Sequence, residues 1–265
     1  MKEIDNTQLK EIQLSILKNV HKFCINNNIK YTIAYGTLLG AIRHHGFIPW
    51  DNDIDISMLR EDYELFVKTY QDEVFKLYEL GTDPQCDIPY AKVYDSRTVL
   101  KEHSRLNIIG VNIDVFPIDG LNDSLKQSLK IYRSFNILKI LRILKGRKSV
   151  PSTSWWWKIL LSFAHFCLWV ITSRKLCEII SEKAKRVNKG GSKYVGLLTG
   201  NSTTDKNIMP RDFFSKVQLM QFEDGLFYGI DNYDEYLRHA YGDYMIFPPK
   251  ELQVVPHAAD EIYWK

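Results

Sequence analysis

The feature that most constrains the fold of this 265-residue chain is a short acidic run, residues 51–56 (DNDIDI). Aspartate stands at every second position up to Asp55, and isoleucine fills positions 54 and 56. Successive side chains of a β-strand point to opposite faces of the sheet. The run therefore predicts a strand whose isoleucines face the core and whose other face holds Asp53 and Asp55 side by side. Asn52 is expected to point away from both.

Two carboxylates held this close repel each other and raise each other's pKa unless a cation joins them. Mg²⁺ prefers oxygen ligands and usually takes one or two carboxylates together with substrate phosphate oxygens. A third aspartate, Asp114, lies between apolar residues in a second predicted strand, Val111–Phe116. Together the three predict a Mg²⁺ (or Mn²⁺) site for phosphoryl or nucleotidyl transfer. Taken alone, an Asp-x-Asp pair is usually solvated, and Asp114 is also compatible with a helix cap or a buried ion pair.

A predicted strand at residues 29–35 runs directly into Gly36 and Thr37, which begin a short predicted helix over 38–43. The first N–H groups of a helix lack partners within the helix and can bind phosphate. Gly36 and Thr37 are therefore candidate phosphate-binding residues, although by themselves they fit an ordinary strand-to-helix turn. Arg43, and Lys92 in the predicted strand Tyr90–Tyr94, are further candidates for contact with the substrate.

Apolar periodicity predicts five longer helices. In the second half of residues 125–145, apolar residues occupy one face and Lys139, Arg142 and Lys145 the opposite face. The two halves of this helix do not share one stripe, which predicts a bend near Asn136. The predicted helices are 7–26, 60–78, 125–145, 173–188 and Tyr233–Tyr241.

The formal net charge of +3 conceals an asymmetry between two parts of the chain. Residues 124–177 contain 11 Lys and Arg and no Asp or Glu, whereas the remainder carries 24 basic and 32 acidic residues. Such a segment predicts a basic face for an anionic surface. Nucleic acid is not the expected partner, because no groove-reading motif is present.

The stretch Trp155–Ile171 has Lys158 as its only charged residue. It fits either a helix at the membrane interface or a buried core helix. A membrane-spanning helix is a third possibility, but it needs about 20 apolar residues and is therefore disfavoured for this stretch. We therefore expect a single domain over 1–265, with 124–177 as a helical, membrane-facing insertion. Scattered cysteines and a polar start predict a cytoplasmic protein, peripheral at the inner face of the cell membrane.

Residues 36–56 (GTLLGAIRHHGFIPWDNDIDI) resemble the signature of the LicD family. The resemblance continues in residues 92–98 (KVYDSRT) and 112–120 (NIDVFPIDG), and in a closing pattern over 233–257. The chain departs from the signature at Asn52, where Asp is common. Because residue 52 is expected to point away from the paired aspartates, no loss of metal binding is expected.

The resemblance implies an α/β (α+β) nucleotidyltransferase-like fold, in which a mixed sheet is flanked by helices. It places Gly36 and Thr37 at the phosphate and makes Asp53, Asp55 and Asp114 the acidic triad. It implies a CDP-alcohol donor, CDP-choline in the best-known members and CDP-ribitol or CDP-glycerol in relatives. The acceptor would be a lipid-linked or surface glycan of capsule, teichoic acid or lipopolysaccharide. Two alternatives stay open: a nucleotidyltransferase that leaves NMP on its acceptor, and an inactive scaffold in glycan assembly.

Overall fold

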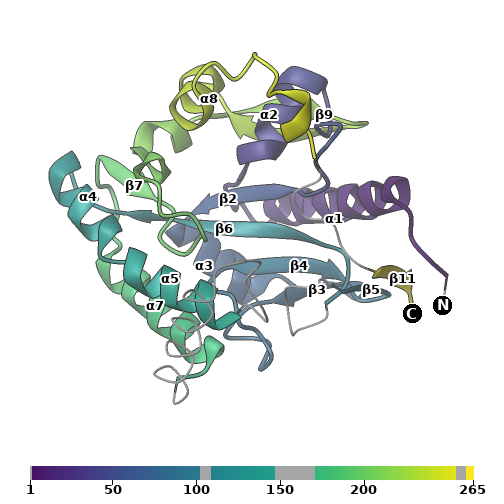
Figure 1. The fold of residues 1–265 in the computed structure, drawn as a ribbon, viewed down its shortest axis with the longest axis horizontal. Helices are drawn as coiled ribbons and strands as arrows, with labels where there is room; N and C mark the ends of the chain where they lie inside the picture. The colour runs from purple at the N-terminus through teal and green to yellow at the C-terminus, as the bar shows by residue number, and fades with distance from the viewer. Residues whose placement is uncertain (1, 102–108, 147–170, 255–260) are drawn as a thin grey trace.

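The computed structural model describes residues 2–101, 109–146, 171–254 and 261–265 (Figure 1). Its centre is a nine-stranded sheet in the order β3-β4-β6-β2-β1-β10-β9, with β7 joined to β6 and β8 to β7. The strands are β1 (Thr32–Ile33), β2 (Asp55–Leu59), β3 (Phe75–Tyr78), β4 (Ala91–Asp95), β6 (Asn112–Gly120), β7 (Tyr194–Gly196), β8 (Ile208–Pro210), β9 (Val217–Phe222) and β10 (Gly225–Ile230). A separate small sheet pairs β5 (Thr98–Lys101) with β11 (Glu261–Trp264).

The large sheet is mixed. β2 pairs in parallel with β6, and β1 with β10, whereas the other pairs are antiparallel. The helices around it are α1 (Asn6–Asn26), α2 (Tyr35–His44), α3 (Arg60–Thr69), α4 (Leu125–Arg133), α5 (Asn136–Gly146), α7 (Ser173–Val187) and α8 (Tyr233–Tyr241). The described residues also include three 3₁₀ helices: Asp205–Asn207, Arg211–Phe214 and Lys250–Leu252. The predicted fold class, a mixed sheet flanked by helices, is confirmed.

The main core lies where the first three helices meet the sheet. α1 begins with a capping box between Asp5 and Gln8 and turns its apolar stripe inward. It packs against β4 and β6, while α3 packs against β2 and β6. A second, smaller apolar cluster joins α4, α5 and α7 to β8. Its buried members are Leu121, Tyr132, Phe135, Ile180, Ala184, Leu198 and Ile208.

The predicted helix over 60–78 is wrong in its second half. α3 ends at Thr69, and residues 75–78 form β3 at the edge of the sheet, paired with β4. The carboxylate of Asp72 accepts hydrogen bonds from the N–H groups of Val74 and Phe75, both at 2.8 Å, and so closes a turn between the two elements. The open edge of β4 then supplies a hydrogen-bonding partner that the local pattern did not reveal.

The other predicted elements agree more closely with the structure. The predicted strand at 29–35 is reduced to Thr32–Ile33, because α2 already begins at Tyr35. The expected bend near Asn136 is confirmed by the break between α4 and α5. The predicted helices at 7–26, 173–188 and Tyr233–Tyr241 are confirmed to within one residue at each end.

In α5 the basic side, not the apolar side, faces the protein. Lys139 is 0% exposed and Arg142 is 8% exposed, whereas Ile137 and Ile140 are 70% and 49% exposed. Among the described helices, none combines the length and the hydropathy needed to cross a bilayer. Residues 155–170, on which the interfacial-helix prediction depended, lie outside the described residues. The single-domain organisation with an insertion at 124–177 stays a prediction.

Candidate active site

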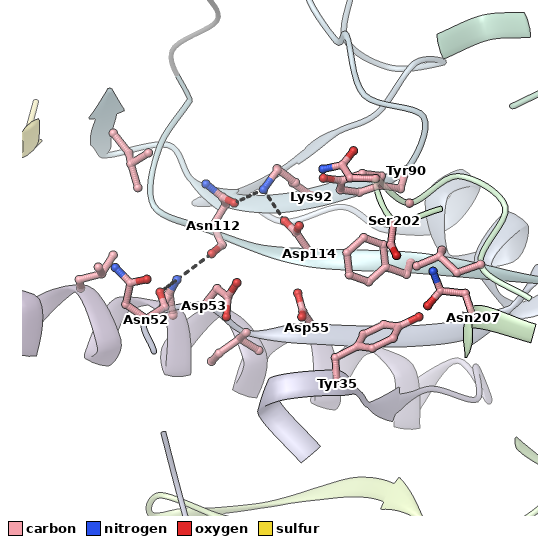
Figure 2. A pocket seen from close by; sticks show the side chains of 18 residues that line it. Tyr35, Asn52, Asp53, Asp55, Tyr90, Lys92, Asn112, Asp114, Ser202 and Asn207 are labelled. Atoms are coloured by element: carbon pink, nitrogen blue, oxygen red, sulfur yellow. Dashed lines mark hydrogen bonds and ion pairs between the residues drawn. The ribbon is translucent and has the colours of Figure 1, made fainter. Parts of the chain in front are cut away.

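Three charged residues form a row across three neighbouring strands. In the parallel pair of β2 and β6, Asp55 lies opposite Asp114, and in the antiparallel pair of β4 and β6, Lys92 lies opposite Asp114. Residues directly opposite each other share one face of the sheet. Figure 2 shows the three side chains projecting into the same space, with Asp53 beside them. The sheet thus brings together residues that lie up to 61 positions apart in the chain.

This row lines a cavity of about 300 Å³. The sheet provides one wall, α1 provides Leu9 and Gln13, and the segment 197–207 closes another side. The lining residues are Leu9, Gln13, Tyr35, Asn52, Asp53, Ile54, Asp55, Tyr90, Lys92, Leu100, Asn112, Asp114, Phe116, Leu197, Gly200, Asn201, Ser202 and Asn207. The cavity is therefore polar where the charged row lies and apolar or aromatic elsewhere.

Of the seven predicted site residues, four line the cavity: Asp53, Asp55, Lys92 and Asp114. Gly36 and Thr37 lie in the first turn of α2 and are not among its lining residues. The Thr37 hydroxyl accepts a hydrogen bond of 2.8 Å from the N–H of Asp55 and so positions this aspartate. A Cβ atom at residue 36 would come within 2.9 Å of the Asp51 carboxylate, so a larger residue here would displace that side chain. Contact of the two residues with phosphate stays a prediction.

Arg43 also lies away from the cavity lining. Its Nη1 donates to the carbonyl oxygen of Tyr244 at 2.8 Å, and its guanidinium lies 4.8 Å from the ring centroid of Phe247. These contacts tie α2 to the segment after α8. A substrate-binding role for Arg43 stays a prediction.

Asn52 precedes β2, which begins at Asp55, and it is 8% exposed. It is among the residues that line the cavity, as is the core residue Ile54. The expected direction of the Asn52 side chain, away from the paired aspartates, stays a prediction. Asp53 reaches the cavity from the same preceding segment.

Negative charge is concentrated at this site. Burial, together with the carboxylates of Asp53 and Asp114, raises the pKa of Asp55 well above its usual value, and Lys92 opposes the shift. Lys92 forms an ion pair with Asp114 and donates to Oδ1 of Asn112 at 2.8 Å. Among the described residues, Lys92 thus lies beside Asp114 and near Asp55, and this concentration of carboxylates would favour a bound cation.

The described part of the chain contains no group of three or more His, Cys, Asp or Glu side chains placed to hold a metal ion. The ammonium of Lys92 pairs with Asp114 from the β4 side. Asp53 and Asp55 both line the cavity, and two carboxylates plus substrate phosphate oxygens suit Mg²⁺. The residues therefore fit a two-carboxylate site, while Asp114 as a third ligand stays a prediction.

Several lining residues were missed by the sequence analysis. Tyr90 lies two residues before Lys92, and Phe116 lies two residues after Asp114, so strand alternation could have identified both. Gln13 interrupts the apolar stripe of α1 and is 4% exposed. Its Nε2 donates to the carbonyl oxygens of Asn52 at 2.9 Å and Asn112 at 3.2 Å, which holds the two strand entrances together.

No sequence pattern indicated that the segment 197–207 lines the cavity. It is held in place by the basic side of α5, where Lys139 donates to the carbonyl oxygens of Ser202 at 3.0 Å and Leu197 at 3.3 Å. Arg142 forms a hydrogen bond to the side chain of Asn201. Burial, with a further contribution from Arg142, lowers the pKa of Lys139 to about 7. Buried cations on α5 thus shape one wall of the cavity.

Comparison with known proteins agrees with this geometry. The family model "LicD/FKTN/FKRP, nucleotidyltransferase domain" matches residues 28–135, which include α2 and strands β1 to β6. The chain is 30% identical over 275 aligned positions to the lipopolysaccharide cholinephosphotransferase LicD of Haemophilus influenzae, with 99% of each chain covered. This chain is also 53% identical over 47 residues, 18% of its length, to an uncharacterised protein of Rickettsia prowazekii and to one of Rickettsia typhi.

Proposed function

The chain belongs to the LicD/FKTN/FKRP nucleotidyltransferase-domain family, and on that premise we propose that it transfers phosphocholine from CDP-choline to a sugar hydroxyl of a lipopolysaccharide or related surface glycan. The full-length similarity to a cholinephosphotransferase supports the donor and the acceptor class. The observation that carries the proposal is the row Lys92–Asp114–Asp55 along the floor of a 300 Å³ cavity.

Asp53 and Asp55 would hold Mg²⁺, which when bound would neutralise the phosphate oxygens of the donor. The chain itself supplies position. Thr37 anchors the N–H of Asp55, and Gln13 joins the strand entrances that carry Asp53 and Asp114. Phosphoryl transfer depends mainly on such positioning and on electrostatic stabilisation.

Asp114 is placed to receive the proton of the attacking sugar hydroxyl. The sugar oxygen forms a bond to the choline-bearing phosphorus, the bond from that phosphorus to CMP breaks, and the hydroxyl proton passes to a carboxylate oxygen of Asp114. Lys92 holds this carboxylate in place through their ion pair. Its ammonium also stands where it can meet a phosphate oxygen of the donor.

A donor panel tests this proposal. The purified protein is incubated with Mg²⁺, a lipopolysaccharide acceptor and one donor: CDP-choline, CDP-ethanolamine, CDP-ribitol or CDP-glycerol. The mass of the acceptor is then measured by mass spectrometry. We expect an added phosphocholine and the release of CMP. An acceptor that gains CMP identifies NMP transfer instead. If no donor is either transferred or hydrolysed, the protein is an inactive scaffold. Asp55→Asn is the matched variant that should abolish the product.

We also propose that the chain binds the inner face of the membrane through α4 and α5. Ile137 and Ile140 are exposed on α5, and Leu125 is 47% exposed on α4 next to the exposed Lys126. On α4 the exposed Lys126 and Lys130 stand with Leu125, and apolar side chains beside basic ones suit an anionic lipid surface. This surface would bring the cavity close to a lipid-linked acceptor.

Vesicle sedimentation tests the membrane proposal. We expect the chain to bind phosphatidylglycerol vesicles at low salt, and the double change of Ile137 and Ile140 to Ser to weaken binding about tenfold. The matched control changes two equally exposed residues of the C-terminal segment, Ile246 and Leu252, to Ser. Equal losses in both variants, or no binding by the unmodified chain, would contradict the proposal.

A further inference from the structure

One part of the cavity is lined by aromatic side chains. Tyr35, Tyr90 and Phe116 are its aromatic lining residues. The ring of Phe116 lies 5.7 Å from that of Tyr35 at an interplanar angle of 88°, and 4.8 Å from that of Tyr90 at 54° (centroid distances). The three rings come from the start of α2, from the residue before β4 and from β6, and together they form one continuous aromatic surface.

This surface lies next to the charged row because of strand alternation. Phe116 follows Asp114 by two residues on β6, and Tyr90 precedes Lys92 by two residues next to the antiparallel β4. Two residues along a strand span about 7 Å. Tyr90 and Phe116 thus lie two residues along their strands from Lys92 and Asp114 and line the same cavity. A short alkyl chain attached to a phosphate at the carboxylates would reach the rings.

Tyr35 is held in an unusual way. Its φ of 47° lies in the left-handed region, which bulky residues rarely adopt. Its hydroxyl group is buried, and among the described residues it has no hydrogen-bond partner. Both features cost stability. Figure 2 shows Tyr35 on the α2 side of Asp55 and Tyr90 on the β4 side of Asp114, so that the two rings flank the aspartates.

The chemistry of the surroundings selects the kind of group that fits. Ring faces attract cations, and Trp, Tyr and Phe together form the usual recognition surface for quaternary ammonium groups. Such a group has no N–H and gains nothing from hydrogen-bond acceptors. A primary ammonium or a polyol would lose hydrogen bonds to water against the same rings.

We propose that Tyr35, Tyr90 and Phe116 form a subsite for the quaternary ammonium group of the donor. The subsite gives the cavity its selectivity for a choline-bearing donor over one that carries a primary amine or a polyol. The inference rests on the proposed transferase function and deepens it by assigning donor selectivity to three named residues.

Binding to the full-length chain tests the subsite without any turnover. By titration calorimetry in the presence of Mg²⁺, phosphocholine should bind at least about tenfold more tightly than phosphoethanolamine, the difference expected from lost cation–π contacts. Equal affinities would overturn the subsite. If the preference is present but no phosphocholine is transferred from CDP-choline, the subsite stands and the proposed reaction is the part that fails.

Ring-specific variants assign the preference to residues. Tyr90→Leu and Phe116→Leu should each weaken phosphocholine binding about tenfold and leave phosphoethanolamine binding unchanged, whereas Tyr90→Phe, which keeps the ring, should bind both as the unmodified chain does. In turnover assays the Leu variants should raise KM for CDP-choline with little change in kcat.

Phe66→Leu is the matched control, because Phe66 is a fully buried aromatic residue of α3 that does not line the cavity. It should lower stability and keep the preference for phosphocholine. Leu variants that keep the preference would overturn the assignment, as would its loss in Tyr90→Phe. Should the Leu variants not fold, the comparison of phosphocholine with phosphoethanolamine on the unmodified chain still decides.

Discussion

The strand β6 carries two aspartates on opposite faces of the sheet, and their surroundings differ. Asp119 is 0% exposed and accepts two hydrogen bonds from Arg60, from Nε at 2.7 Å and from Nη2 at 3.0 Å. Asp114 faces the cavity, shares one ammonium group with two further carboxylates nearby, and is 19% exposed.

The two regions differ in how their charges are paired. On the Asp119 side each charge has a matched partner in forked geometry, which is the arrangement that keeps a buried ion pair tolerable. On the Asp114 side, among the described residues, the carboxylates of Asp53 and Asp114 raise the pKa of Asp55 and Lys92 opposes the rise. The first arrangement stabilises the fold, whereas the second is the kind expected where a ligand binds.

The largest effect is expected when the ion pair between Asp119 and Arg60 is broken. Asp119→Asn leaves the buried guanidinium of Arg60 without its counter-charge, and we expect the free energy of unfolding to fall by about 3–5 kcal/mol. Urea denaturation measures this loss. Glu64→Gln is the control, because Glu64 contacts Arg60 from a half-exposed position and its loss should cost less than about 1 kcal/mol. Similar losses in both variants would contradict the distinction.

The second prediction removes a charge from the Asp114 side. Asp55→Asn should lower the turnover of the proposed transfer about a hundredfold or more, which corresponds to about 3 kcal/mol of transition-state stabilisation. The measurement is the initial rate of phosphocholine transfer at saturating Mg²⁺. Near-normal turnover in the folded variant would remove Asp55 from the site.

Asp55→Asn should also be more stable than the unmodified chain at a pH at which Asp55 is ionised in the unfolded state. The pKa of Asp55 is higher in the folded than in the unfolded state, so stability falls as the pH rises from the unfolded-state pKa of about 3.9 to the folded-state pKa and stays lower above it. Without Mg²⁺, Asp55→Asn should therefore unfold at a higher urea concentration than the unmodified chain at pH 8. The difference should vanish below about pH 4, where the carboxylate is protonated in both states.

A smaller effect is expected from the loss of Lys92 on the same side. Lys92→Met removes the ammonium group that pairs with Asp114 and leaves that carboxylate free for a metal ion. We expect Mg²⁺ to bind about tenfold more tightly, or by about 1.4 kcal/mol, as measured by calorimetry without substrate. Weaker Mg²⁺ binding in this variant would mean that Asp114 does not face the same ion as Asp53 and Asp55.

The smallest expected effect concerns a buried cation that has no carboxylate among its hydrogen-bond partners. Lys139 donates to oxygen atoms of Tyr132, Leu197 and Ser202, and its pKa in the folded state is about 7. Between this value and the unfolded pKa near 10.4 the unfolded state binds more protons, so stability rises with pH. We expect a rise of about 1 kcal/mol between pH 7 and 8, which Lys139→Met should abolish. Parallel pH profiles for the two proteins would contradict this assignment.

Local sequence pattern was a sound guide where a residue's surroundings are set within a few positions. The predicted strand around Asp114 and the apolar stripe of α1 are both present in the structure. It was a poor guide at 75–78, where pairing with β4 replaced the helix, and at α5, whose basic side turned inward to bind the carbonyl groups of 197–202. In both cases the deciding partner is remote in the chain.

The sequence by itself determined the family and the fold class and predicted the acidic residues of the candidate site, because those depend on a contiguous motif and on the two-residue period of a strand. Only the tertiary structure decided that Asp55 lies opposite Asp114, that Lys92 pairs with it, and that three aromatic rings adjoin them. The physical reason is that strand register and the packing of α5 are set by contacts between distant segments, and these contacts are stable only when the whole sheet has formed.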